Sequence, residues 1–109
     1  MERKAMIIGL KADKIEEYKE LHAAVWPSVI AQLERSNFRN FSIFLREPEN
    51  LLFGYFEYHG TDFEADSALI AADPETQRWW TLTDPCQQPL ASAGEGEQWS
   101  MMEEVFHMD

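Results

Sequence analysis

The segment from residue 3 to residue 10 constrains the fold most strongly, because it is apolar on both of its alternating sets of positions. Over residues 5 to 10, one set reads Ala, Ile, Gly and the other reads Met, Ile, Leu. Successive side chains of a β-strand point to opposite faces of the sheet. A strand with two apolar faces has to be covered by protein on both sides. The fold must therefore supply a cover for each face of the sheet.

A helix is predicted directly after this strand. Asp13 followed by Glu16 has the charge pattern of a capping box, so we expect Asp13 to cap the helix. The apolar positions that follow are spaced by three, four or seven residues and form one stripe facing the core: Ile15, Tyr18, Val25, Val29 and Leu33. Pro27 lacks a backbone N–H and disfavours helical angles at the residue before it. It therefore predicts a kink or break one turn past His22.

The remaining elements follow from apolar runs and turn residues. Strands are predicted over residues 41–46 and 51–58, joined as a hairpin by the Glu-Pro-Glu-Asn turn at 47–50. Helices are predicted over 63–72 and from Pro74 to about Leu82. Residues 85–98 read as one long loop, and residues 101–108 as a last strand.

The resulting order is strand, helix, strand, strand, helix, strand. It predicts an α+β fold, a ferredoxin-like βαββαβ sandwich with both helices on one face of an antiparallel sheet. With 109 residues, the chain has the size of a single domain, residues 1–109. The other face of the sheet would be bare, and a second copy of the chain is the simplest cover for it. We therefore expect a homodimer.

Composition narrows the class of partner and the compartment. The formal net charge of −11 opposes binding to nucleic acid and to anionic membrane surfaces, so a small neutral ligand fits better. Cys86 is the only cysteine, which rules out an internal disulfide and favours a reducing compartment. No stretch approaches the roughly 20 apolar residues of a membrane span, and the N-terminus does not read as a signal peptide. We expect a soluble, cytoplasmic protein.

His22 is the first candidate for chemistry. Tyr18, His22 and Trp26 are spaced by four residues, which places them along one edge of a continuous helix. Histidine is the side chain whose ordinary pKa, about 6.5, allows proton transfer near neutral pH. A core histidine hydrogen-bonded to the backbone is the alternative, and spacing alone favours it.

The adjacent residues Trp79 and Trp80 form the second unusual feature, because neighbours on a short helix cannot both point into one core. One of them should reach a cavity or an interface. An indole face suits the C–H face of a sugar, and the indole N–H can donate to a hydroxyl. Ordinary packing in the core or in a dimer interface explains the pair equally well.

Other constellations carry little chemistry. His59 adjoins Gly60 in a predicted turn, and His107 lies near Glu104, where a surface ion pair is the default. The three histidines and one cysteine show no zinc-ligand spacing, so we expect no metal site. The chain contains neither a glycine-rich phosphate loop nor a nucleophile elbow.

Taken together, several motifs resemble those of the L-rhamnose mutarotase family, and the resemblance runs nearly end to end. It rests on Glu16-Glu17-Tyr18, His22 followed by Val25-Trp26-Pro27, Asn40 and the strand after it, Asn50-Leu51-Leu52-Phe53, Gln77-Arg78-Trp79-Trp80 and Glu104-Val105-Phe106. The resemblance implies a dimeric α+β barrel that interconverts sugar anomers without a cofactor. It also implies that His22 is the proton donor and that Tyr18, Trp79 and Trp80 contact the sugar.

The chain departs from that family at two positions, where Phe41 and Phe44 replace tyrosines, the first of which contacts sugar in some members. Loss of a phenol removes a donor and acceptor, so the preferred 6-deoxy sugar can differ from L-rhamnose. L-fucose is then the alternative substrate. Two other hypotheses stay open: a cofactor-independent monooxygenase or haem-degrading enzyme of the same architecture, and a non-catalytic sugar-binding dimer.

Overall fold

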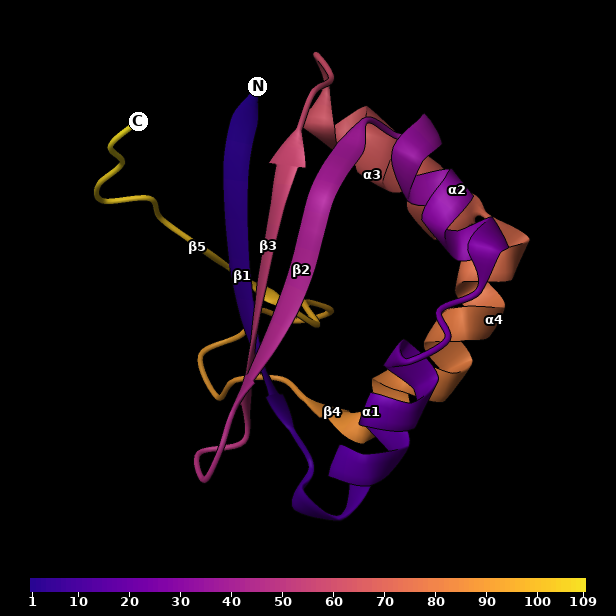
Figure 1. The fold of residues 1–109 in the computed structure, drawn as a ribbon, viewed down its shortest axis with the longest axis vertical. Coiled ribbons are helices and arrows are strands. Elements are labelled where there is room, and N and C mark those ends of the chain that lie inside the picture. The colour runs from indigo at the N-terminus through magenta and orange to yellow at the C-terminus, as the bar shows by residue number, and fades with distance from the viewer.

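The computed structural model describes residues 1–109 and shows an antiparallel sheet with helices on one side (Figure 1). The central strand β1 (Glu2–Leu10) pairs with β3 (Leu51–Tyr58), which pairs in turn with β2 (Phe38–Arg46). The other edge of β1 pairs with two short strands, β4 (Gln87–Gln88) and β5 (Ser100–Met102). The predicted order of elements is confirmed, and so is the ferredoxin-like α+β architecture.

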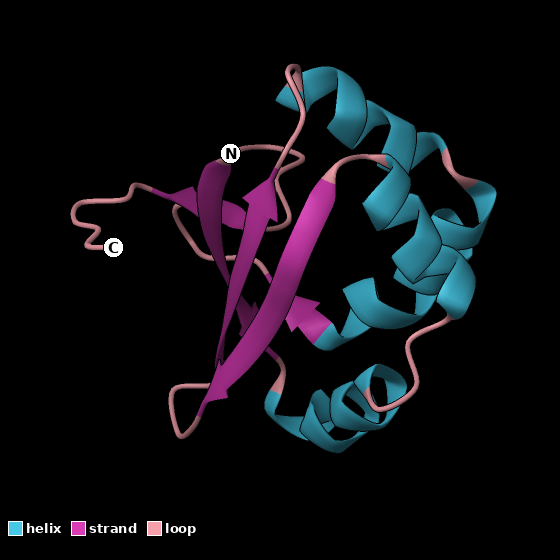
Figure 2. Ribbon diagram, turned by 45° about the horizontal axis from the view of Figure 1, so that its top comes forward, coloured by secondary structure: helices cyan, strands magenta, loops and turns pink.

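The two faces of the sheet have different surroundings. All four α-helices lie over one face, which we call the inner face, and none covers the outer face (Figure 2). Ile8 pairs with Leu52 on the inner face, and both are buried in the core. On the outer face, Ile7 pairs with Phe53 and Phe53 with Phe44. The outer face therefore carries apolar side chains with no helix over them (Figure 2), and Phe44 among them is exposed.

The first helical region is broken as predicted, but it begins differently. α1 (Ile15–His22) ends at His22, Trp26 is extended with φ −61° and ψ 131°, and Pro27 begins α2 (Pro27–Arg35). The predicted cap at Asp13 is wrong, because Asp13 lies inside the 3-10 turn η1 (Ala12–Lys14). The N-cap residue of α1 is Lys14, whose side chain makes no capping bond. The extra turn before α1 displaces Asp13 from the capping position.

Aspartates do cap the two later helices. Asp62 accepts a hydrogen bond from the Ala65 N–H, at 3.1 Å, and starts α3 (Phe63–Ala72). Asp73 accepts from the Thr76 N–H, at 2.9 Å, and starts α4 (Pro74–Thr83). Each bond satisfies an N–H that has no partner within its helix. Both helices match their predicted ranges to within one residue.

β2 begins three residues before the predicted strand and contains a β-bulge. The register with β3 shifts between Arg39 and Ser42, and Asn40 lies in the left-handed region with φ 49°. Asparagine tolerates that conformation better than most residues. The extra residue brings Phe41 to the inner face, where it stacks on Phe56.

The C-terminal part differs most from expectation. The predicted loop at 85–98 contains part of the 3-10 turn η2 (Asp84–Cys86) and all of β4. The predicted strand at 101–108 is mostly wrong, since β5 ends at Met102. After Met102 the chain leaves the edge of β1 (Figure 1). None of the helices is long and apolar enough to cross a lipid bilayer.

Candidate active site

A cavity of about 1240 Å³ lies between the inner face of the sheet and the helices. Its wall is mostly apolar, with Met6, Phe41 and Phe56 on the sheet side. A smaller pocket of about 130 Å³ adjoins it, and Tyr18 and His22 line both spaces. An apolar cavity with a few polar groups is the usual form of a small-molecule site.

His22, the last residue of α1, has a fixed orientation at the wall of this cavity. Its Nδ1 lies 2.9 Å from the backbone carbonyl oxygen of Tyr18. A carbonyl oxygen only accepts, so Nδ1 carries a hydrogen and donates it. Nε2, on the opposite side of the ring, is therefore the nitrogen that can gain and lose a proton. Burial lowers the pKa of His22 below its usual 6.5, and the bond to the Tyr18 carbonyl offsets part of that effect.

Tyr18 lies one helical turn before His22, and the two rings stack. Their centroids are 4.1 Å apart with an interplanar angle of 26°. The Tyr18 hydroxyl accepts a hydrogen bond from the side-chain amide of Gln87, at 3.2 Å. Burial raises the pKa of Tyr18 to about 12, so the phenol keeps its proton at any ordinary pH.

The two adjacent tryptophans diverge as neighbours on a helix must. Trp79 is buried and meets the His22 ring edge-on, with centroids 5.4 Å apart. Trp80 is 37% exposed, and both indoles line the cavity. Trp26 packs against Trp79 at 5.2 Å and does not line the cavity. The break at Pro27 thus makes Trp26 a support for Trp79 rather than part of the wall.

Two lining residues, Gln87 and Gln98, come from the predicted loop at 85–98, and a third, Trp99, directly follows it. Gln87 is 5% exposed, and its carbonyl oxygen accepts a hydrogen bond from the Gln98 amide at 3.1 Å. Polar residues among prolines and glycines gave no sign of this burial. It arises because β4 pairs with the end of β1, where Gln87 faces Leu10.

The two positions that depart from the family pattern lie on opposite faces of the sheet. Phe41 lines the cavity, so its missing phenol bears on what the site can bind. Phe44 lies on the outer face, is 63% exposed and lines neither pocket. Phe44 therefore lies away from the cavity, and the lost phenol bears on the site only at Phe41.

The other two histidines and the cysteine line neither pocket, whereas the carboxylate of Asp84 lines the cavity and has a pKa raised by burial. Cys86 is buried, its thiol donates to Glu17 at 3.1 Å, and its pKa is raised to about 11, mainly by burial, so it is no nucleophile. His59 lies 3.9 Å from Glu57, and His107 lies 2.9 Å from Asp109. The chain contains no group of three or more His, Cys, Asp or Glu side chains that could hold a metal ion.

The sequence matches a known family over nearly its whole length. A sequence model of L-rhamnose mutarotase matches residues 3–108. The chain is 33% identical over 109 residues to the L-rhamnose mutarotase of Oceanobacillus iheyensis, with both chains covered in full. It is 36% identical over 115 residues to that of Yersinia pestis, again with full coverage of both.

Solved structures show the same fold. An L-rhamnose mutarotase from Formosa agariphila aligns with a TM-score of 0.78 and 24% identity, with both chains covered in full. A putative antibiotic biosynthesis monooxygenase from Nitrosomonas europaea aligns with a TM-score of 0.60 and 14% identity over 97% of this chain and 100% of that one. The second likeness extends to the fold alone. The match over nearly the whole sequence shows that this chain belongs to the L-rhamnose mutarotase family.

Proposed function

We propose that this enzyme, a carbohydrate isomerase by family, interconverts the α and β anomers of L-rhamnose, with His22 as its proton carrier. The observation that supports this role is the hydrogen bond that fixes the imidazole. Nδ1 donates to a backbone carbonyl, so Nε2 is the nitrogen that can exchange a proton, at the wall of a cavity large enough for a pyranose.

Anomer exchange has simple proton requirements. Ring opening places a proton on the ring oxygen and removes one from the anomeric hydroxyl, so the bond between the anomeric carbon and the ring oxygen breaks. The open aldehyde then turns and closes on its other face. Closure takes the proton back from the former ring oxygen and returns one to the aldehyde oxygen, which becomes the new anomeric hydroxyl. One group that donates in opening and accepts in closing serves both directions.

His22 fits this double role. Its imidazolium donates from Nε2 to the ring oxygen, and the neutral ring takes the proton back on closure. The lowered pKa makes the imidazolium a stronger acid than an exposed histidine. A well-placed general acid or base contributes about 10²- to 10⁴-fold to a rate. A water or a carboxylate would remove the anomeric proton.

The surrounding aromatic side chains hold the sugar. Tyr18 supplies a hydroxyl that stays protonated, beside the stacked His22 ring. Trp79 and Trp80 present indole surface to the cavity, and such surface packs on the C–H face of a pyranose. We propose Tyr18, Trp79 and Trp80 as substrate-binding residues on these grounds.

L-fucose is the second candidate substrate, and Phe41 is the reason. The phenyl ring of Phe41 in the cavity wall cannot hydrogen-bond to a sugar hydroxyl. A sugar that places no hydroxyl next to Phe41 therefore loses no hydrogen bond at this position. Both sugars are 6-deoxy aldoses, whose methyl group suits the apolar wall. The choice between them depends on which hydroxyl would face Phe41.

The test is saturation-transfer NMR of anomer exchange with L-rhamnose, L-fucose and common D-aldoses. We expect acceleration of L-rhamnose exchange well above that of the D-aldoses. Preferential acceleration of L-fucose would support the second candidate. Binding of an aldose with no change in exchange rate would contradict catalysis, and oxygen consumption with quinols would indicate the monooxygenase alternative.

We further propose that the enzyme is a homodimer formed by the outer faces of two sheets. The apolar residues of this face lie side by side on β1, β3 and β2, and Phe44 is 63% exposed. The C-terminal tail, residues 103–109, adds three exposed apolar side chains: Val105, Phe106 and Met108. A large apolar patch with a polar rim is typical of an interface.

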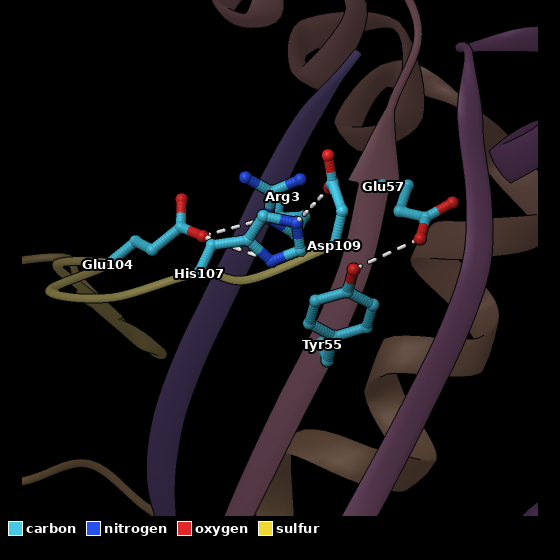
Figure 3. Close-up of polar contacts among 6 residues, drawn as sticks. All are labelled: Arg3, Tyr55, Glu57, Glu104, His107 and Asp109. Atoms are coloured by element: carbon cyan, nitrogen blue, oxygen red, sulfur yellow. Dashed lines mark hydrogen bonds and ion pairs between the residues drawn. The ribbon is translucent and has the colours of Figure 1, made fainter.

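The polar rim of this face lies where β1 begins and β3 ends, near the tail. Arg3 donates to Glu104 at 2.8 Å, and Tyr55 donates to Glu57 at 3.0 Å (Figure 3). The Arg3–Glu104 pair anchors the tail beside the outer face, so the same face of a second copy would cover both at once. A dimer of the family's α+β barrel type fits this arrangement. We propose the cytoplasm as its location, where the single thiol stays reduced.

A further inference from the structure

Three side chains form a directed series of hydrogen bonds at the cavity wall. The Gln98 amide donates to the carbonyl oxygen of Gln87 at 3.1 Å, and the Gln87 amide donates to the Tyr18 hydroxyl at 3.2 Å. Gln87 and Tyr18 are each 5% exposed, so water does not compete freely for these groups. All three residues line the cavity.

The direction of this series decides what Tyr18 can do. A phenol carries one hydrogen and can accept as well as donate. If Gln87 donates to the oxygen, the single hydrogen of the hydroxyl is free for another partner. If the amide were turned around, the hydroxyl would donate to Gln87 and would offer a sugar only an acceptor.

We infer that Gln87, oriented by Gln98, is a positioning residue that makes the Tyr18 hydroxyl a hydrogen-bond donor to the sugar. This inference rests on the proposed mutarotase function. The Tyr18 hydroxyl makes no other hydrogen bond in the chain, so its hydrogen remains available on the cavity side. The Tyr18 donor then lies beside the His22 ring, which stacks on the Tyr18 ring. A sugar oxygen held by Tyr18 is thereby kept close to the imidazole.

Glutamine-to-glutamate substitutions can reverse the direction of these hydrogen bonds while keeping the shape of the side chain. In Gln87→Glu, a carboxylate replaces the amide and can only accept, so Tyr18 must donate to it. In Gln98→Glu, the new carboxylate attracts the amide N–H of Gln87 and turns its carbonyl oxygen toward Tyr18. The second variant reaches Tyr18 only through Gln87 and changes a less buried position. Gln88→Glu is the matched control, because Gln88 is exposed and adjacent and lines neither pocket.

The experiment measures kcat and KM for L-rhamnose exchange at pH 7.5, with circular dichroism as the check on folding. We expect kcat/KM to fall about tenfold in Gln87→Glu and in Gln98→Glu, the size of one lost hydrogen bond, and to stay unchanged in Gln88→Glu. In a Tyr18→Phe background, both substitutions should have almost no further effect. Wild-type kcat/KM in either single variant would overturn the inference while leaving the mutarotase function intact. Equal losses with and without the Tyr18 hydroxyl would overturn it too.

A spectroscopic reading separates this inference from the proposed function. The intensity ratio of the tyrosine doublet in the Raman spectrum reports whether a phenol donates or accepts. We expect the ratio to move toward the strong-donor value in Gln87→Glu and to stay unchanged in Gln88→Glu. An unchanged doublet in Gln87→Glu would refute the assigned direction, even if the wild-type protein accelerated no sugar's exchange.

Discussion

At residue 22, burial and a backbone carbonyl act on one imidazole in opposite directions. Burial disfavours the charged ring, while the bond from Nδ1 to the Tyr18 carbonyl favours it, and the net result is a lowered pKa. The same bond fixes which nitrogen exchanges protons. A helix that ends at His22 leaves this ring at the wall of the cavity instead of inside the helical stripe.

The lowered pKa predicts a pH dependence of defined sign. Ring opening requires the imidazolium, so kcat/KM should fall as pH rises through the His22 pKa, with a midpoint below the usual 6.5. Exchange rates of L-rhamnose measured by NMR between pH 5 and 8 give this profile. A rate that rises with pH through the same midpoint would mean that neutral His22 acts first, as a base.

The two indoles should differ in their effects when removed. Trp79 is 5% exposed and Trp80 is 37% exposed, although both line the cavity. Trp79→Ala should lower the free energy of unfolding by about 3–5 kcal/mol, as expected for a buried large residue, and weaken sugar binding. Trp80→Ala should weaken binding at a far smaller cost in stability. Urea unfolding and calorimetric sugar titration measure the two effects, and equal destabilisation by both variants would contradict this assignment.

The four candidate residues singled out in the sequence all line the cavity, but the sequence did not reveal their partners. Tyr18, His22, Trp79 and Trp80 were recognisable because helical spacing and paired indoles are local features. Gln87 and Gln98 were not, since their burial depends on β4 pairing with β1 across more than 70 residues of chain. A glutamine in a segment rich in proline and glycine reads as solvated until the tertiary fold is known.

At the scale of elements, the sequence predicted the boundaries of helices well where a single residue determines where a helix begins or ends. Pro27 breaks the helix, and Pro74 begins α4. It failed where tertiary contacts decide. The turn η1 removes Asp13 from its capping role, and β5 stops at Met102 although the following residues are apolar enough for a strand.

The cap at Asp73 predicts a measurable contribution to stability. Its carboxylate accepts from the N–H and the hydroxyl of Thr76, at 2.9 and 2.8 Å. Asp73→Ala should lower the free energy of unfolding by about 0.5–2 kcal/mol, the usual effect of losing a helix cap. Thermal or urea unfolding measures the loss. Asp73→Asn, which keeps a capping oxygen, is the control, and equal losses in both variants would argue against the capping role.

For the whole molecule, the uneven cover of the sheet is the main feature. The cavity lies between the inner face and the helices. No helix lies over the outer face (Figure 2). The strand pattern alone predicted that both faces need a cover, and the chain itself supplies only one. The second cover is what the proposed dimer would provide.

Phe44→Glu tests that cover. A charge at this 63% exposed position on the outer face should prevent two sheets from packing, so sedimentation velocity should show a single chain where the unaltered protein shows two. Leu69→Glu is the control, because Leu69 is 56% exposed on the outside of α3 and lies on no sheet face. A dimer that persists in Phe44→Glu and dissociates in Leu69→Glu would place the interface elsewhere.

The proposal that His22 carries the proton has one direct test. Saturation-transfer NMR compares the rate of L-rhamnose anomer exchange in His22→Ala with that in the unaltered enzyme. We expect a loss of about 10²- to 10⁴-fold, since a general acid contributes that much, with circular dichroism and sedimentation unchanged. Undiminished exchange by a folded His22→Ala protein would show that the imidazole carries no proton in this reaction.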